Sequence, residues 1–245
     1  MVDLKENERM YGDLAWTWPI ISPPEDYMSE AGQFRAAIEK YSEIPVRTVL
    51  NLGCGGGHND FHLKEHYDIT GVDISDGMLQ NARELNPGVK YLKGDMRSAR
   101  LGKNFDAVII ADAIMYMLSE EDLLAAFKTA FNHLNPGGVF CTYAEELREN
   151  FSRGTHCHES KSRGGMDITL IEHKWDPDPD DTQFEFMFIY IINESGKVRV
   201  ETDRHTCGIF PLSAWKRLLA ESGFKVKVLK LEEDGMLHFI VCKKR

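Results

Sequence analysis

The chain has 245 residues, of which 42% are hydrophobic and 10% aromatic. This composition supports a sizeable core and excludes disorder as the main state, and the length suits one principal domain with an elaboration. The formal net charge of −10 repels phosphate backbones and anionic lipids, so it disfavours nucleic acids and membrane surfaces as partners.

The distribution of cysteines and the N-terminal residues give an expectation for where in the cell the protein is located. The five cysteines are widely spread and include no C-x-x-C pair, which indicates neither a disulfide framework nor a zinc ribbon. Residues 1–13 contain no apolar segment of the kind found in signal peptides, and no apolar run in the chain is long enough to span a bilayer. We therefore expect a cytoplasmic protein.

The first 45 residues predict an arm followed by a helix. Apolar residues recur at helical spacing over residues 27–41. The stretch before them is rich in aromatic residues and contains Pro19, Pro23 and Pro24, which cannot belong to that helix. We expect an irregular aromatic arm at this end of the domain.

Strands and helices alternate over residues 46–147. Apolar runs predict strands at 46–52, 69–72, 89–92, 107–110 and 139–143, and helical spacing predicts helices at 58–66, 76–85 and 120–134. Ser119 and Asp122 fit a capping box at the start of the last helix, and a turn at 135–138 precedes the last strand. This alternation predicts a doubly wound parallel sheet.

The hydrophobic period changes beyond residue 148. Apolar residues alternate with polar ones over 166–170, 184–190 and 198–202, which predicts three antiparallel strands with no helix between them. Residues 210–245 again show the helix and strand patterns of the α/β segment, with a helix capped by Ser213 and strands at 226–231 and 237–241. We therefore expect a small antiparallel sheet, residues 148–209, inserted into an α/β core of residues 46–147 and 210–245.

A glycine-rich segment follows the first predicted strand. Gly53 and Gly55 lie between a buried strand and a helix, where the missing Cβ atoms let a ligand approach the backbone N–H groups. Asp73 ends the next strand, where a carboxylate can accept hydrogen bonds from both hydroxyls of a ribose. His58 stands where a dinucleotide fingerprint requires Gly or Ala, so the pattern disfavours NAD.

Several segments in chain order resemble class I S-adenosylmethionine-dependent methyltransferases. They are LGCGGGH at 52–58, ITGVDIS at 69–75, KGDMR at 93–97, FDAVIIADAIMYM at 105–117 and LNPGGVF at 134–140. The resemblance implies a doubly wound, seven-stranded Rossmann-like sheet with the small antiparallel β-sheet inserted into it. It also implies S-adenosyl-L-methionine as the cofactor, and we expect no metal.

The resemblance further implies roles for individual residues. Gly53 and Gly55 would face the methionine moiety, and Asp73 would hold the ribose. Asn51 departs from the family pattern, which has an acidic residue there, because an amide accepts a hydrogen bond without contributing charge. The expected cofactor-binding residues, of which Tyr11 and Trp18 could instead form the wall of an apolar acceptor site, are Tyr11, Trp18, Tyr27, Asn51, Gly53, Cys54, Gly55, Asp73, Ile74, Met78, Asp95, Met96 and Ala111.

A narrower resemblance concerns the acceptor. GMLQNARELNP at 77–87, GDMRSARLGKNFDAV at 94–108 and the inserted sheet resemble small-molecule methyltransferases, including N,N-dimethyltransferases of nucleotide-linked amino sugars. This implies in-line transfer of a methyl group to a small-molecule acceptor, most naturally an amine. The arm and first helix would then be a lid, and the inserted sheet would form part of the acceptor site or a dimer contact. Tyr116 and His205 are the candidate catalytic residues, His205 as a proton acceptor.

Other interpretations remain open at this point. The fold also suits an RNA or protein methyltransferase, or a cofactor-binding protein without turnover, although the net charge speaks against RNA. His58, His62 and His66 have a helical spacing without a further ligand type, so we expect a solvated helix face. Met187, Ile189 and Ile191 make the second face of the middle inserted strand apolar, which predicts self-association as a homodimer.

Overall fold

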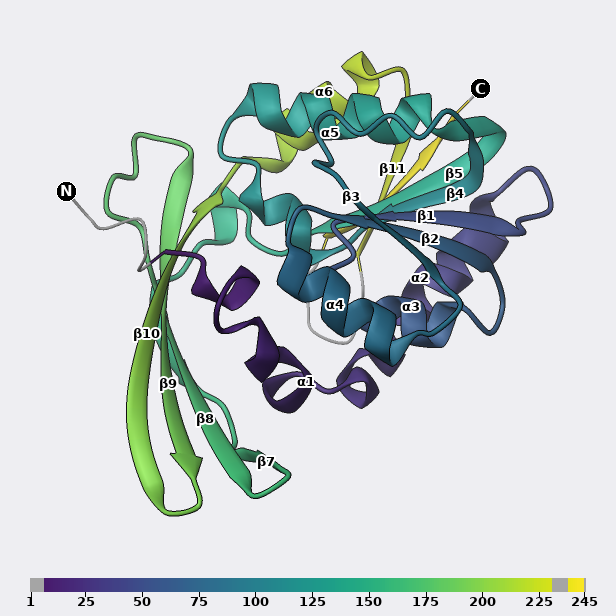
Figure 1. Cartoon of the computed structure of the whole chain (residues 1–245). Helices are drawn as coiled ribbons and strands as arrows, with labels where there is room; N and C mark the ends of the chain where they lie inside the picture. Colours follow the sequence, from purple (N-terminus) through teal and green to yellow (C-terminus); the bar gives the residue numbers. More distant parts are fainter. Residues whose placement is uncertain (1–6, 231–237, 245) are drawn as a thin grey trace.

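The computed structural model describes residues 7–230 and 238–244, and its larger sheet has seven strands (Figure 1). Their spatial order is β11-β12-β5-β4-β1-β2-β3. The strands are β1 (Thr48–Leu52), β2 (Asp68–Asp73), β3 (Lys90–Lys93), β4 (Phe105–Ile110), β5 (Leu134–Ala144), β11 (Lys225–Lys230) and β12 (His238–Lys243). The first five are parallel, whereas β12 runs antiparallel to β5 and β11 antiparallel to β12.

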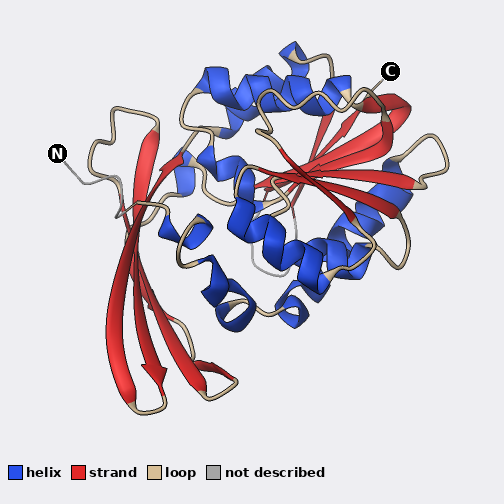
Figure 2. Cartoon of the chain, viewed as in Figure 1, coloured by secondary structure: helices blue, strands red, loops and turns tan. Residues whose placement is uncertain are grey.

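Helices cover both faces of this sheet (Figure 2). They are α2 (Met28–Tyr41), α3 (His58–Leu63) and α4 (Asp76–Leu85) on one face, and α5 (Glu120–Asn132) and α6 (Leu212–Glu221) on the other. The central strands are buried on both sides, which explains their apolar runs: Leu50 and Val108 face the α5 and α6 side, while Val49 and Ala107 face α2. The sheet order reverses beside β1, the place where open α/β sheets bind ligands.

Local capping explains where some helices begin. The Ser119 Oγ accepts a hydrogen bond from the Asp122 N–H at 3.1 Å, as the capping pattern predicts. Ser213 is not a cap, which corrects the sequence-based prediction: α6 begins one residue earlier, at Leu212, with Pro211 at the N-cap position. Pro211 is suited to this place because it has no N–H and its φ of −68° leads into a helix.

The second sheet is antiparallel and has five strands, not three. They are β6 (Gly154–Cys157), β7 (Lys161–Arg163), β8 (Met166–Trp175), β9 (Gln183–Glu194) and β10 (Lys197–Gly208). Their order is β10-β9-β8-β6, and β7 also pairs with β8. The sequence pattern missed β6 and β7 because both are short and polar, so they carry no apolar alternation.

From residue 7 onward, where the description of the chain begins, the arm has four short helical segments. These are η2 (Arg9–Tyr11), η3 (Ala15–Thr17), α1 (Trp18–Ile21) and η4 (Pro24–Tyr27). The arm runs between the inserted sheet and the core (Figure 1). Of the predicted bounds, α3 ends at Leu63 rather than 66 and β5 begins at Leu134, while positions 231 and 237 lie outside the described residues.

The two sheets together confirm the predicted fold class, a doubly wound α/β core with an inserted small antiparallel sheet. Within residues 7–230 and 238–244, no helix combines the length and apolarity needed to cross a bilayer.

Candidate active site

A cavity of about 330 Å³ lies at the carboxyl ends of β1, β2 and β4. Its wall is formed by the glycine loop after β1, the segments after β2, β3 and β4, and the arm. All thirteen residues that the sequence predicted to bind a cofactor line this cavity, and so does Tyr116. His205 is not part of the wall, because it is fully buried on β10 behind Tyr116.

The glycine loop has two positions with different requirements. Gly53 has a φ of +73°, and a Cβ there would lie only 2.7 Å from Met96 Cε and would also overlap Ala113. Gly55 has a φ of +51°, but a Cβ there would meet no atom within 4 Å. Gly53 is therefore required by close packing, and Gly55 lines open space in the cavity wall.

Asp73 is held in place by the backbone of the loop and the next helix. Its Oδ2 accepts a hydrogen bond from the Gly55 N–H at 2.7 Å, and its Oδ1 accepts one from the Ser75 N–H at 2.9 Å. Burial raises the pKa of Asp73, although these backbone donors oppose that shift. The carboxylate is thus oriented at the cavity wall and keeps lone pairs for a further donor.

Two amide oxygens in the cavity wall have no protein donor. Asn51 Oδ1 and Asn59 Oδ1 are buried and lack a hydrogen-bond partner. Asp60 fixes the orientation of the Asn51 side chain, because Asn51 Nδ2 donates a hydrogen bond to Asp60 Oδ1 at 2.8 Å. A buried carbonyl oxygen without a hydrogen-bond donor lowers the stability of the folded protein. The two oxygens are therefore suited to accept hydrogen bonds from a ligand that carries N–H groups, such as an ammonium.

Acidic side chains surround the same end of the cavity. The Tyr143 hydroxyl donates to Glu30 Oε2 at 3.1 Å and also contacts Asp112, while Asn59 Nδ2 donates to Glu30. Burial and the neighbouring Asp112 raise the pKa of Glu30 to about 7. The Glu30 and Asp112 pair therefore holds a proton near neutral pH, and a bound cation would favour its fully ionised form.

The far wall of the cavity contains two tyrosines in contact. The Tyr11 hydroxyl of the arm donates to the Tyr116 hydroxyl at 2.9 Å. Tyr116 ends the η5 segment (Asp112–Tyr116) that follows β4, and its hydroxyl lies 2.8 Å from His205 Nδ1. The structure thus brings both candidate catalytic residues together, with Tyr116 at the cavity and His205 behind it.

The predicted histidine row is not a solvated helix face. His58 is buried, and its Nδ1 accepts a hydrogen bond from Trp18 Nε1 at 3.1 Å because the arm packs over α3. Burial lowers the pKa of His58 to about 4, so its imidazole is neutral. His62 contacts the Pro24 carbonyl at 2.7 Å, while His66 lies beyond α3 and contacts Arg35. Among the residues that the structure describes, no cluster of three or more His, Cys, Asp or Glu side chains is arranged to hold a metal ion.

Sequence patterns missed several residues of the site. Asn59, Asp112 and Glu8 line the cavity, and Tyr143 holds the acidic pair from β5. The positions of Asp112 and Tyr143 at the carboxyl ends of predicted strands were an available signal. No local pattern indicates Glu8, which reaches the cavity only because the arm folds back.

Comparison with known proteins identifies the family. Residues 49–138 match the family described as methyltransferase domain. This segment is a methyltransferase domain. The match begins in β1 and ends in β5, so it contains the glycine loop, Asp73 and Tyr116. The predicted methyltransferase family and enzyme class are confirmed for this segment.

Relatives extend the similarity over most of the chain. A dTDP-3-amino-3,4,6-trideoxy-α-D-glucopyranose N,N-dimethyltransferase from Streptomyces venezuelae is 29% identical over 220 residues, covering 88% of this chain and 91% of the relative. A dTDP-3-amino-3,6-dideoxy-α-D-glucopyranose N,N-dimethyltransferase from Streptomyces fradiae is 26% identical over 84% of this chain and 80% of its own length. The crystal structure of Streptomyces venezuelae DesVI has the same fold, with a TM-score of 0.83, 24% identity and coverage of 95% and 96% of the two chains.

Proposed function

We propose that this methyltransferase transfers a methyl group from S-adenosylmethionine to the amine nitrogen of a small-molecule acceptor by in-line displacement. When bound, the cofactor supplies an electrophilic methyl group on a sulfonium sulfur. The unpaired amide oxygens of Asn51 and Asn59 carry this proposal, because they suit the methionine ammonium. They lie in the same cavity as Asp73, which suits the ribose, and Ile74, which offers the adenine an apolar side chain.

The charge of the cavity supports an amine as the acceptor. Glu8 lines the cavity together with Tyr11 and Tyr116, and Asp112 is a further carboxylate in its wall. Carboxylates attract a cationic amine and raise its local concentration, whereas they repel a carboxylate acceptor. Positioning of the nitrogen lone pair is the main requirement of the reaction, and a cavity lined by both the arm and η5 serves it.

The class of acceptor is proposed from the relatives. The two Streptomyces relatives and one from Saccharopolyspora spinosa are named as N,N-dimethyltransferases of dTDP-linked amino sugars. All three similarities span at least four-fifths of both chains, at identities of 23% to 29%. We therefore propose a nucleotide-linked amino sugar as the acceptor, methylated on its amino nitrogen.

Isotope transfer tests the proposed reaction. The protein is incubated with methyl-labelled S-adenosylmethionine and a dTDP-linked 3-amino sugar, and the products are separated and weighed by mass spectrometry. We expect labelled sugar carrying one or two added methyl groups. Parallel incubations contain RNA, a protein mixture, or simple aliphatic amines. Label found in RNA or protein would replace the small-molecule proposal, and cofactor binding without any labelled product would indicate a binding protein without turnover.

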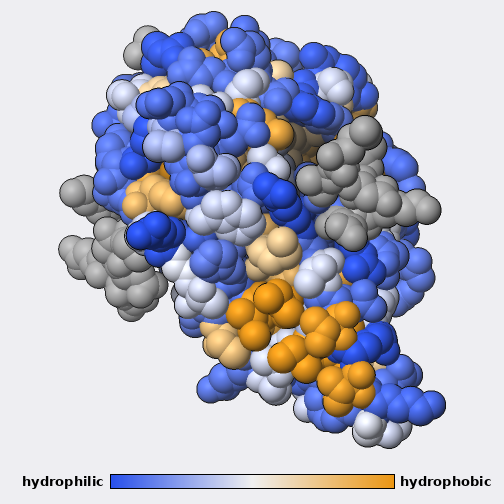
Figure 3. Space-filling view, turned by 90° about the vertical axis from the view of Figure 1, so that its left-hand side faces the viewer, coloured by the Kyte–Doolittle hydropathy of each residue, from blue (hydrophilic) through white to orange (hydrophobic). Residues whose placement is uncertain are grey.

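We further propose that the inserted sheet forms a homodimer contact. Its face away from the core carries Ile171, Ile189, Ile191, Val198 and Val200, and the last two are 65% and 60% exposed. Val200 lies directly opposite Ile191 on the neighbouring strand. Figure 3 shows hydrophobic side chains gathered over this sheet. A two-fold axis would cover the patch with the same patch of a second copy.

Sedimentation velocity tests the dimer. We expect the wild-type protein to sediment as a dimer and Val200→Asp as a monomer, because a charge in the centre of an apolar contact must be desolvated. Met28→Asp is the matched control, since Met28 is 65% exposed but belongs to α2 and not to the apolar patch. A wild-type monomer at high protein concentration, or a dimer that survives Val200→Asp, would contradict the proposal.

A further inference from the structure

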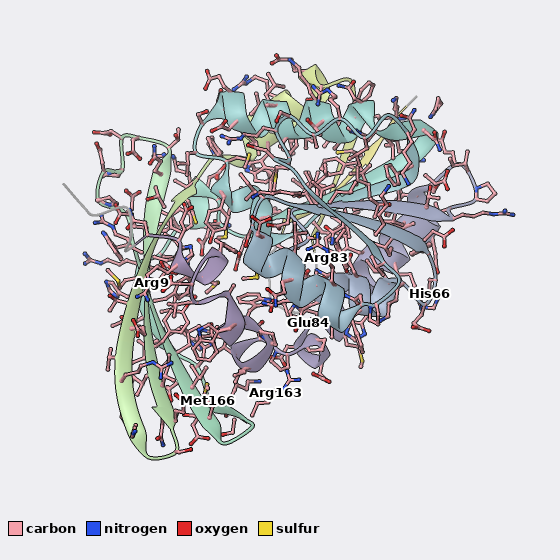
Figure 4. The ribbon with its side chains drawn as sticks, viewed as in Figure 1. Arg9, His66, Arg83, Glu84, Arg163 and Met166 are labelled. Atoms are coloured by element: carbon pink, nitrogen blue, oxygen red, sulfur yellow. The ribbon has the colours of Figure 1, made fainter. Side chains whose placement is uncertain are left out.

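Asp203 links the arm to the buried histidine. It is fully buried on β10, where its Oδ1 accepts a hydrogen bond from the Arg9 N–H at 2.8 Å and its Oδ2 accepts one from the Met10 N–H at 2.7 Å. Oδ2 also lies 2.7 Å from His205 Nε2. Figure 4 shows Arg9 where the arm meets the inserted sheet. One carboxylate therefore anchors the first turn of the arm and contacts His205.

These contacts determine the direction of a hydrogen-bond chain. An ionised carboxylate only accepts hydrogen bonds. The proton of the neutral imidazole is therefore on His205 Nε2, and this N–H group donates a hydrogen bond to Asp203. In the neutral imidazole Nδ1 is then an acceptor, and the Tyr116 hydroxyl donates to it over 2.8 Å. Tyr11 donates to Tyr116, which leaves a lone pair of the Tyr116 oxygen for an N–H group in the cavity.

On the basis of the proposed function, we infer that Tyr116 and His205 relay a proton away from the acceptor amine, and that Asp203 is the positioning residue of this relay. The N–H bond of the protonated acceptor breaks and its proton moves to the Tyr116 oxygen, while the Tyr116 O–H proton moves to His205 Nδ1. The electron pair of the broken bond stays on nitrogen as the lone pair that attacks the methyl group. After product release the proton returns through Tyr116 to water in the cavity.

The surroundings of the relay support this division of roles. Burial raises the pKa of Tyr116 well above its usual range, so the phenol passes a proton on rather than ionising by itself. The imidazolium that forms on His205 is paired with Asp203 and faces Glu172 of β8. Phe188 of β9 and Tyr11 of the arm pack against its ring at 4.9 and 5.6 Å, and Glu8 faces Tyr116. This arrangement favours a transient positive charge on the buried imidazole.

The same carboxylate makes the relay depend on the arm. Asp203 receives two of its hydrogen bonds from arm N–H groups, and the arm also docks on β10 through the Glu8 N–H, which donates to the Arg204 carbonyl at 3.0 Å. Tyr11 lies in the same turn as Met10. When the arm lies on β10, the contacts that orient His205 and Tyr116 are therefore all present together.

Steady-state kinetics of His205→Gln, Asp203→Asn and Tyr116→Phe test the relay. At about pH 6.5 we expect kcat with the amino sugar to fall about 100-fold in His205→Gln and Tyr116→Phe. The deficit should shrink as the pH is raised to about 9, because the free amine then binds already deprotonated. Affinity for S-adenosylhomocysteine should be unchanged in His205→Gln, since His205 does not line the cavity. His66→Gln is the matched control, as His66 lies at the opposite end of the molecule from Arg9 (Figure 4).

The outcomes separate the relay from the proposed function. Wild-type kcat in His205→Gln at both pH values would overturn the relay, and so would an equal deficit at both, which indicates a merely structural role. A wild-type enzyme that methylates a phenol but no amine would overturn the amine acceptor. In that case a deficit of His205→Gln on the phenol, shrinking with pH, would still support the relay, because a phenol must also lose its proton.

Discussion

Asp73→Ala is expected to weaken binding of S-adenosylhomocysteine by about 4 kcal/mol, or roughly 1,000-fold, in isothermal titration calorimetry. The carboxylate is oriented by the Gly55 and Ser75 N–H groups and would accept both ribose hydroxyls, each a hydrogen bond to a charged group. Its removal also leaves the Gly55 N–H without its acceptor, so the glycine loop loses one of its contacts with β2, while the hydrogen bonds from the Gly53 and Cys54 N–H groups to the Val72 carbonyl remain.

A control on the same strand makes this result specific. Asp68 begins β2, at the end opposite Asp73, and is exposed. Asp68→Ala should leave the dissociation constant unchanged while removing the same charge from the protein. If Asp73→Ala bound S-adenosylhomocysteine as tightly as the wild type does, the proposed role of Asp73 would be wrong.

Gly53→Ala is expected to lower the free energy of unfolding by about 3 kcal/mol in urea titrations. Two costs combine at this position. The φ of +73° strains any residue with a Cβ, and the added methyl group would overlap Ala113 and approach Met96 Cε to 2.7 Å. Both neighbours belong to the cavity wall, so we also expect weaker cofactor binding in the folded fraction.

Gly55→Ala separates the two costs. Gly55 also has a positive φ, but an added methyl group meets no atom within 4 Å. Backbone strain alone should therefore cost about 1 kcal/mol in this variant. Equal stability losses in Gly53→Ala and Gly55→Ala would show that close packing at Gly53 is not the reason for the glycine.

Features that depend on neighbouring residues in the chain were predictable. Apolar runs and helical spacing indicated β1 to β5 and their helices, and the interval from Gly53 to Asp73 indicated a nucleotide-like ligand. The topology of an α/β sheet then brings such segments together, because the carboxyl ends of its parallel strands share one edge. For this reason all thirteen predicted cofactor-binding residues line one cavity.

Features that depend on weak local signals were predicted less well. The strands β6 and β7 are polar and pair along the edge of β8, so hydrogen bonds to a neighbour define them rather than apolar alternation. The histidines of α3 were expected to face solvent because the spacing on a helix does not say what packs against it. The arm covers that helix and buries His58 against Trp18.

The sequence by itself determined the α/β core, the inserted sheet, the glycine loop and the carboxylate at the end of β2, because each depends on the spacing of residues within a few tens of positions of the chain. Only the tertiary structure decided which side chains complete the site. Asp203 meets the N–H groups of Arg9 and Met10, and His205 meets Tyr116, across separations of about 90 to 190 residues in the chain. Such contacts arise from the packing of the arm and the inserted sheet against the core, and they cannot be predicted from the periodicity of the sequence.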